Sequence, residues 1–217
     1  MTQFICRAVI FDLDGVLVDS RACIEYHWRI WAAKHQLDLA TILRVDSGRR
    51  PIETIGIVAP GLDAAQEAAQ FEADEAFDIR GVIKIAGAAR LLNSLPPRQW
   101  GIATSATKDT ALTRINHTGL PIPDVLVTAD DVTQGKPHPE AYLLAANRLG
   151  IAPQDCLVVE DAPAGIKAAL EAGMQVLAIA STHSASELTA ASLVVESIAK
   201  IQLSSSHQSA DLVLVCH

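Results

Sequence analysis

Short apolar runs alternate along this chain with stretches in which apolar residues recur every three or four positions. The runs predict strands and the recurring pattern predicts helices. We expect strands at residues 7–11, 100–104, 125–128, 156–159 and 175–179. Strands that alternate with helices are typical of α/β proteins built on a parallel sheet. The pattern therefore predicts an α/β fold.

Three apolar stripes with helical spacing lie between the predicted strands. They occupy residues 88–95, 141–149 and 166–170, and Gly150 and Gly173 follow the second and third as C-terminal stops. We expect these stripes to pack against the sheet.

Residues 19–86 contain no convincing strand. Ile24, Trp28 and Trp31 form a stripe within a helix predicted at residues 20–34, and a second helix is predicted at residues 62–77. This region is therefore predicted to be a helical insert after the first strand. The chain then divides into residues 1–18 with 87–217, and residues 19–86.

The C-terminal region has a weaker pattern. Residues 203–209 are rich in serine and predict a loop, whereas residues 211–215 suit either a last edge strand or a frayed tail.

Composition excludes several classes of protein. Of the 217 residues, 17 are basic and 25 acidic, for a net charge of -8, and no basic patch suggests nucleic-acid binding. No apolar run approaches the roughly 18 residues of a membrane span, and we see no secretory signal. The four cysteines are scattered without C-x-x-C spacing, which favours reduced thiols in the cytoplasm.

The strongest chemical signal follows the first predicted strand. Asp12 and Asp14 stand two positions apart, and Gly15 allows a sharp turn after them. Two carboxylates so close repel each other unless a partner such as a hard divalent cation joins them. An acidic loop without chemistry is the alternative.

Three further polar groups follow later strands. Residues 104–107 carry hydroxyls ahead of a helix, where an anion site or a plain N-cap is expected. Lys136 stands between Gly135 and Pro137, and could supply a fixed charge to a phosphate or lie on the surface. Glu160 and Asp161 end a buried strand, where they could cap the next helix or complete a metal site with Asp12 and Asp14.

In combination these motifs resemble the haloacid dehalogenase superfamily of phosphohydrolases. The resemblance spans residues 9–197 and is carried by D-x-D-G-V-L-V-D-S, the Thr-Ser segment, G-K-P-H-P and E-D-A-P-A-G-I. The chain is most similar to the sugar-phosphatase branch, of which β-phosphoglucomutase is a close cousin. The resemblance implies a Rossmann-like doubly wound core with an α-helical cap. It also implies a Mg²⁺-dependent phosphatase of small sugar or polyol phosphates. Separately from the resemblance, we expect a cytoplasmic monomer or weak homodimer that binds neither nucleic acid nor membrane.

The resemblance also implies roles for individual residues. Asp12 is expected to be the nucleophile that forms an aspartyl-phosphate, and Asp14 the general acid and base. Ser105, the N–H of Ala106 and Lys136 are expected to bind the phosphoryl group. The expected Mg²⁺ ligands are the carboxylate of Asp12, the backbone carbonyl of Asp14, Asp161 and, as a ligand or through a water, Glu160.

In the cap, Arg49 is the candidate for contact with substrate oxygens. Relatives often have His-Gly-Arg here, and this chain has Ser47 in place of the histidine. The alternative activity is a β-phosphoglucomutase-type phosphotransfer. Such mutases carry a cap histidine where this chain has Ile24, and His27 comes three residues later. A non-catalytic binding module is disfavoured because the core motif residues are all present.

Overall fold

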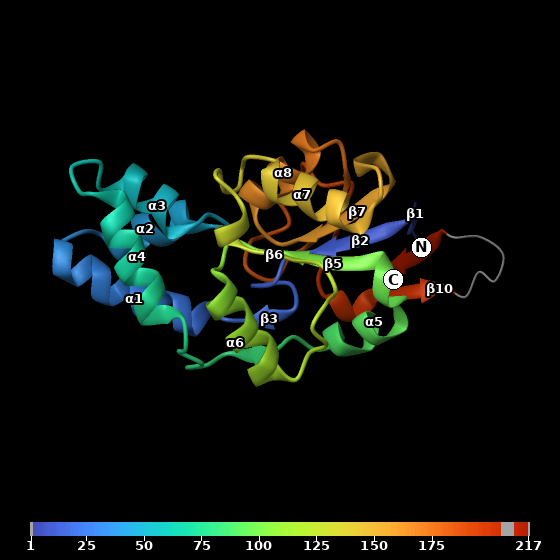
Figure 1. Ribbon diagram of the computed structural model, residues 1–217, viewed down its shortest axis with the longest axis horizontal. Helices are drawn as coiled ribbons and strands as arrows, with labels where there is room; N and C mark the ends of the chain where they lie inside the picture. The colour runs from blue at the N-terminus through green and yellow to red at the C-terminus, as the bar shows by residue number, and fades with distance from the viewer. Residues whose placement is uncertain (1, 205–210, 217) are drawn as a thin grey trace.

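A six-stranded parallel sheet forms the centre of the molecule in this computed structural model, which describes residues 2–204 and 211–216. Its strands lie in the order β6-β5-β2-β7-β8-β9 (Figure 1). Their bounds are β2 Ala8–Phe11, β5 Trp100–Ala103, β6 Leu126–Val127, β7 Cys156–Glu160, β8 Gln175–Ile179 and β9 Leu193–Val195. All neighbouring pairs are parallel. The predicted α/β class is confirmed, and β9 is an additional strand.

Helices cover both faces of this sheet. Figure 1 shows α5 (Ala88–Ser94) and α6 (Lys108–Thr118) on one side, and α7 (Glu140–Leu149) and α8 (Pro163–Glu171) on the other. Strands buried on both faces consist of continuous apolar residues, as β2 and β5 do. The predicted stripes are mostly buried, but Leu170 is 42% exposed and lies outside the core. Gly150 ends α7 with a φ of 70°, a left-handed conformation that glycine adopts readily.

A small antiparallel sheet joins the two ends of the chain. The order is β1 (Thr2–Cys6), β11 (Leu212–Cys216) and β10 (Ile201–Ser204). The prediction of a loop at residues 203–209 is wrong for Leu203 and Ser204, which belong to β10; its remaining residues lie outside those described. Of the two alternatives for residues 211–215, the strand is confirmed as β11. It is the middle strand and not an edge, because β1 and β10 pair with its two sides.

Four helices form the region between β2 and α5. They are α1 (Arg21–His35), α2 (Leu39–Asp46), α3 (Pro51–Val58) and α4 (Ala64–Glu75). They share an apolar cluster in which the rings of Trp28 and Phe71 lie 4.3 Å apart. The sequence analysis predicted α1 and α4 but not α2 and α3, which are two turns long. We call α1–α4 the cap; its predicted bounds, residues 19–86, stay a prediction.

A two-stranded ribbon connects the cap to the sheet. Strand β3 (Val18–Asp19) enters the cap, β4 (Ile83–Lys84) leaves it, and the two pair antiparallel. The expectation of no strand in residues 19–86 is therefore wrong for Asp19, which ends β3, and for Ile83 and Lys84. The latter two residues are exposed and too few to form a recognisable apolar run.

The chain order of the sheet places a crevice beside β2. After β2 the chain adds β5 and β6 on one side, and then returns to add β7, β8 and β9 on the other. In open parallel sheets, ligands bind outside the carboxyl ends of the strands at such a reversal. The cap lies over this edge (Figure 1). Within the described residues, no helix has both the length and the apolar character needed to cross a lipid bilayer.

Candidate active site

A cavity of about 370 Å³ lies between the carboxyl edge of the sheet and the cap. The core contributes Asp12, Asp14, Thr104–Thr107, Arg114, Asp161, Thr182 and His183 among others to its wall, and the cap contributes Ile24, Trp28, Asp46–Arg49, Phe71, Glu72 and Glu75. The structure thus brings most of the sequence-predicted site residues to one pocket.

Asp12 directly follows β2, and its backbone N–H donates to the Val159 carbonyl of β7. Its Oδ1 accepts from the Leu13 N–H at 2.7 Å and lies 3.1 Å from Nζ of Lys136. Burial raises the pKa of Asp12 to about 7; Lys136 opposes this shift, and Glu160 adds to it. No described residue bonds to Oδ2, which leaves that oxygen available.

Lys136 is 1% exposed and lies behind Asp12 rather than on the surface. Its Nζ is 2.7 Å from Oε1 of Glu160. Burial opposes the charged form of Lys136, but the carboxylates of Asp12 and Glu160 keep its pKa above the usual value. The ammonium is therefore fixed beside the candidate nucleophile.

Both oxygens of Glu160 are occupied. Oε1 accepts from the Tyr142 hydroxyl and Lys136, and Oε2 accepts from the N–H groups of Asp161 and Ala162. Burial alone would raise the pKa of Glu160, yet Lys136 and these hydrogen bonds hold it below its usual value. A Cβ on Gly165 would lie 1.5 Å from Oε1, so only glycine fits there.

Asp161 completes a cluster of three buried carboxylates. Its Oδ2 accepts from the Thr182 hydroxyl, and burial, with Glu160 and Asp12 nearby, raises the pKa of Asp161 well above its usual value. One oxygen from each of Asp12, Glu160 and Asp161 lies within 4.8 Å of the others. Among the described residues, Lys136 is the single ammonium beside them, so three ionised carboxylates would carry negative charge in excess. Oxygen donors with excess negative charge fit a hard divalent cation.

Asp14 is held over the same pocket by a turn. Gly15 has a φ of 79°, and a Cβ there would come within 2.0 Å of Asp161. Oδ1 of Asp14 accepts from the Ser20 hydroxyl at 2.6 Å, and Oδ2 lies 2.8 Å from Arg114. Arg114 is a site residue that the sequence analysis missed.

Arg114 extends from α6 and also pairs with Glu75 of the cap at 2.7 Å. It is 2% exposed, so it joins Asp14 and Glu75 inside the molecule. A signal was present in the sequence, because Arg114 interrupts the apolar stripe of Ala111 and Ile115. A charged residue on a buried helix face requires a charged partner.

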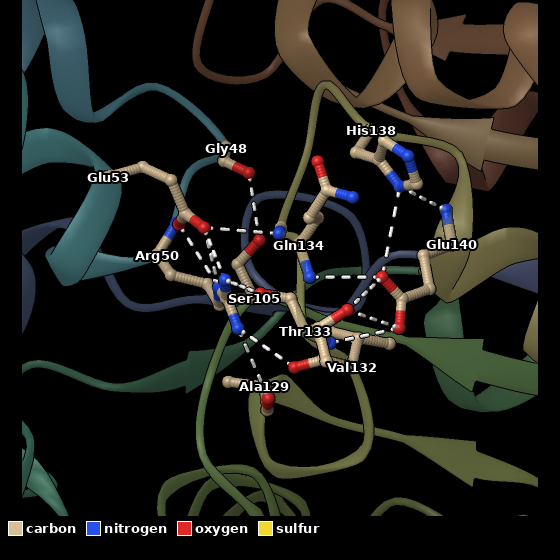
Figure 2. A network of polar contacts seen from close by, with 11 residues as sticks. Gly48, Arg50, Glu53, Ser105, Ala129, Val132, Thr133, Gln134, His138 and Glu140 are labelled. Carbon is tan, nitrogen blue, oxygen red and sulfur yellow. Dashed lines mark hydrogen bonds and ion pairs between the residues drawn. The ribbon is translucent and has the colours of Figure 1, made fainter.

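Ser105 follows β5 and contacts the cap. Its hydroxyl donates to the Gly48 carbonyl at 2.8 Å (Figure 2). The N–H of Ala106 donates to the Thr104 hydroxyl at 3.1 Å, and Thr107 caps α6. The predicted phosphoryl-binding pair therefore lies at the pocket, with both donors bonded within the protein.

The cap loop 47–49 also lines the pocket. Arg49 is half-buried, and its Nη1 donates to the Val45 carbonyl at 2.6 Å. Ser47 bonds through Oγ to Nε2 of His183 at 2.7 Å. The sequence analysis missed His183 and Thr182, although they follow strand β8 and the strand-end rule applies to them as well.

The cap end of the pocket combines aromatic rings with acids. Trp28 and Phe71 provide apolar surface, and Asp46, Glu72 and Glu75 provide carboxyls. Burial raises the pKa of Asp46 to about 7, against hydrogen bonds from Trp28 and Thr54. No described residue donates a hydrogen bond to the side-chain carboxylate of Glu72, so this carboxylate is free to accept one.

Comparison with known proteins agrees with this arrangement. Residues 6–173 match the family model of haloacid dehalogenase-like hydrolases. The chain is 40% identical over 201 residues to hexitol phosphatase A of Escherichia coli K12, covering 90% of the chain and 93% of that protein. It is 36% identical over 191 residues to glycerol-1-phosphate phosphohydrolase 2 of Saccharomyces cerevisiae, covering 81% and 75%. The structure of a β-phosphoglucomutase from Clostridium difficile superposes with a TM-score of 0.77 at 25% identity, covering 91% and 93%.

Proposed function

The chain belongs to the haloacid dehalogenase-like hydrolase family, and from this premise we propose that it is a Mg²⁺-dependent phosphatase of small sugar or polyol phosphate monoesters. The observation that carries the proposal is the group formed by Asp12, Asp161 and Lys136 at the open edge of the sheet. It offers a carboxylate nucleophile, a cation site and a fixed positive charge in one pocket. The phosphatases named above, at 40% and 36% identity, support this chemistry.

In the proposed reaction Asp12 attacks phosphorus and the bond from phosphorus to the substrate oxygen breaks. Asp14 gives its proton to the leaving alkoxide. Asp14 then takes a proton from water, which attacks phosphorus, releases phosphate and frees Asp12. The Ser105 hydroxyl and the Ala106 N–H bind the phosphoryl oxygens after their hydrogen bonds to Gly48 and Thr104 have broken.

Lys136 neutralises charge shared between Asp12 and the phosphoryl group. Glu160 has both oxygens engaged, so we propose that it orients Lys136 rather than binding a cation directly. Asp12, the carbonyl of Asp14 and Asp161 would hold Mg²⁺, which supplies charge stabilisation to the phosphoryl oxygens.

The cap end of the pocket supports a hydroxyl-bearing leaving group. Asp46 and Glu72 offer acceptors to hydroxyls, and Trp28 and Phe71 offer apolar surface to carbon-bound hydrogens. All four cysteines are free thiols, which suits the proposed cytoplasmic location.

The test is phosphate release by the purified protein after chelation of divalent ions. We expect turnover of p-nitrophenyl phosphate, hexitol phosphates and glycerol phosphate only when Mg²⁺ is restored. Loss of the cation removes several kcal/mol of charge stabilisation, roughly a thousandfold in rate. Equal rates with chelator and with Mg²⁺ would contradict the metal proposal, and no release from any ester would contradict the phosphatase proposal.

Arg49→Ala should impair a good polyol phosphate far more than p-nitrophenyl phosphate. Arg49 lies in the cap part of the pocket, whereas the phosphoryl group is bound by the core. Loss of a charge-assisted hydrogen bond costs about 1.5–3 kcal/mol, roughly 10- to 100-fold in kcat/KM. Arg49→Lys should recover only part of this loss. An equal loss on both esters would instead place Arg49 in phosphate binding or folding.

The alternative, a β-phosphoglucomutase-type phosphotransferase, has less support. Ile24 lines the pocket where those mutases carry a histidine. His27 is buried in the cap, with Nε2 2.9 Å from Asp78. Formation of a sugar bisphosphate rather than free phosphate would favour the mutase.

A further inference from the structure

Arg50 and Glu53 form an ion pair at the start of α3. Nε of Arg50 lies 2.9 Å from Oε1 of Glu53, and Glu53 also accepts from the backbone N–H of Arg50. The side chain of Arg50 is 12% exposed and that of Glu53 is 26% exposed, so the pair is partly shielded from solvent. Neither residue lines the pocket described above.

The pair bonds to the backbone of a core loop rather than to side chains. Arg50 donates from Nη1 to the Val132 carbonyl at 3.0 Å and from Nη2 to the Thr133 carbonyl at 2.9 Å. Glu53 accepts from the Gly135 N–H at 3.1 Å. Figure 2 shows these contacts converging on the loop from the side of the cap. Such charge-assisted bonds are stronger and more directional than neutral ones.

The loop leads directly into Lys136. On its other side, Glu140 of α7 accepts from the N–H groups of Thr133 and Gln134 (Figure 2). The loop is therefore held between a core helix and the cap, one residue before the ammonium beside Asp12. A Cβ on Gly135 would lie 2.6 Å from Nε of Arg50 and 2.8 Å from Oε2 of Glu53, so a side chain there would displace the pair.

We propose that Arg50 and Glu53 are positioning residues that set Lys136 against Asp12 when the cap lies over the core. This inference rests on the proposed phosphatase function. Cap closure then does more than cover the substrate, because it completes the charge arrangement around the phosphoryl group. A substrate bound under an open cap meets a less ordered Lys136 loop and reacts more slowly.

The experiment compares three variants that break the contact from different sides. Arg50→Met removes the guanidinium but keeps an unbranched side chain, and Glu53→Gln removes the negative charge. Gly135→Ala inserts a methyl group from the core side without changing either charged residue. Arg44→Met is the matched control, because Arg44 is an exposed cap arginine whose side chain, among the described residues, bonds only to the Thr41 hydroxyl. Unfolding midpoints identify any variant that fails to fold.

We expect kcat to fall roughly 10- to 100-fold. The factor should be the same for p-nitrophenyl phosphate and a polyol phosphate, because a misplaced Lys136 slows the reaction of every substrate. KM should change little. Amide hydrogens of residues 133–136 should exchange faster in all three variants and not in Arg44→Met. Arg50→Met combined with Gly135→Ala should cost no more than either alone, because both break one contact.

Two results would overturn the inference. Unchanged kcat together with faster amide exchange would show that the contact has only a structural role. A fall in kcat confined to the polyol phosphate would show that Arg50 binds substrate. A wild-type protein without phosphatase activity would instead refute the proposed function. The exchange rates of residues 133–136 would then still test whether the pair holds the Lys136 loop.

Discussion

Asp12→Asn is expected to abolish turnover while leaving the fold intact. An amide is a far poorer nucleophile and a poorer cation ligand than a carboxylate, but it fills the same volume. Burial already raises the pKa of Asp12 to about 7, so the protein gains little stability from the charge. Lys136 keeps Glu160 as its partner. We therefore expect the rate of phosphate release to fall below the detection limit, with an unfolding midpoint near that of the wild type.

The matched control is Asp124→Asn, which changes an exposed aspartate that does not line the pocket. Trapping offers a second measurement, because the wild type should bind beryllofluoride as a mimic of aspartyl-phosphate and Asp12→Asn should not. Near-normal phosphatase activity in Asp12→Asn would show that Asp12 is not the nucleophile.

Asp14→Asn is expected to slow the reaction 10²–10⁴-fold on a polyol phosphate, the usual contribution of proton transfer. The backbone carbonyl proposed as a cation ligand survives this change, so Mg²⁺ binding should persist. The loss of charge also leaves Arg114 paired with Glu75.

The diagnostic measurement is single-turnover phosphorylation of the enzyme. p-Nitrophenolate leaves without a proton, so the rate of phosphorylation by p-nitrophenyl phosphate should change little. The polyol alkoxide needs the proton, so the rate of phosphorylation by the polyol phosphate should fall. Equal losses on the two esters would show that Asp14 is not the general acid, and Ser20→Ala would then test whether its hydroxyl orients Asp14.

The core of the site was predictable because its residues end neighbouring strands. Asp12, Ser105 and Asp161 each follow an apolar run, and carboxyl ends of parallel strands meet at one edge of the sheet. Such patterns can be recognised in the sequence because the apolar run forms the strand and the polar residue after it marks the strand's end. Gly15 and Gly165 were in the quoted motifs, but their need to be glycine depends on contacts with Asp161 and Glu160 that only the folded chain makes.

Other features depend on contacts between distant segments, so the partner of each residue had no local signature. Arg114 meets Glu75, and Glu53 meets Gly135, across the boundary between core and cap. The antiparallel sheet pairs Thr2 with Cys216, from opposite ends of the chain. For the same reason the sequence analysis placed Arg49 beside substrate but gave no role to Arg50, its neighbour.

The ribbon of β3 and β4 has an evolutionary consequence. Val18 pairs with Lys84 and Asp19 with Ile83, so the chain leaves for the cap and returns from it at adjacent points. A short hairpin turn could join these two strands in place of residues 20–82, because antiparallel partners need only a tight connection. The core could then acquire, lose or exchange the cap, which we propose contacts the substrate, by insertion at a single position and without rearranging its own strands. Specificity in such a protein could therefore change by exchange of the whole cap while the core stays the same.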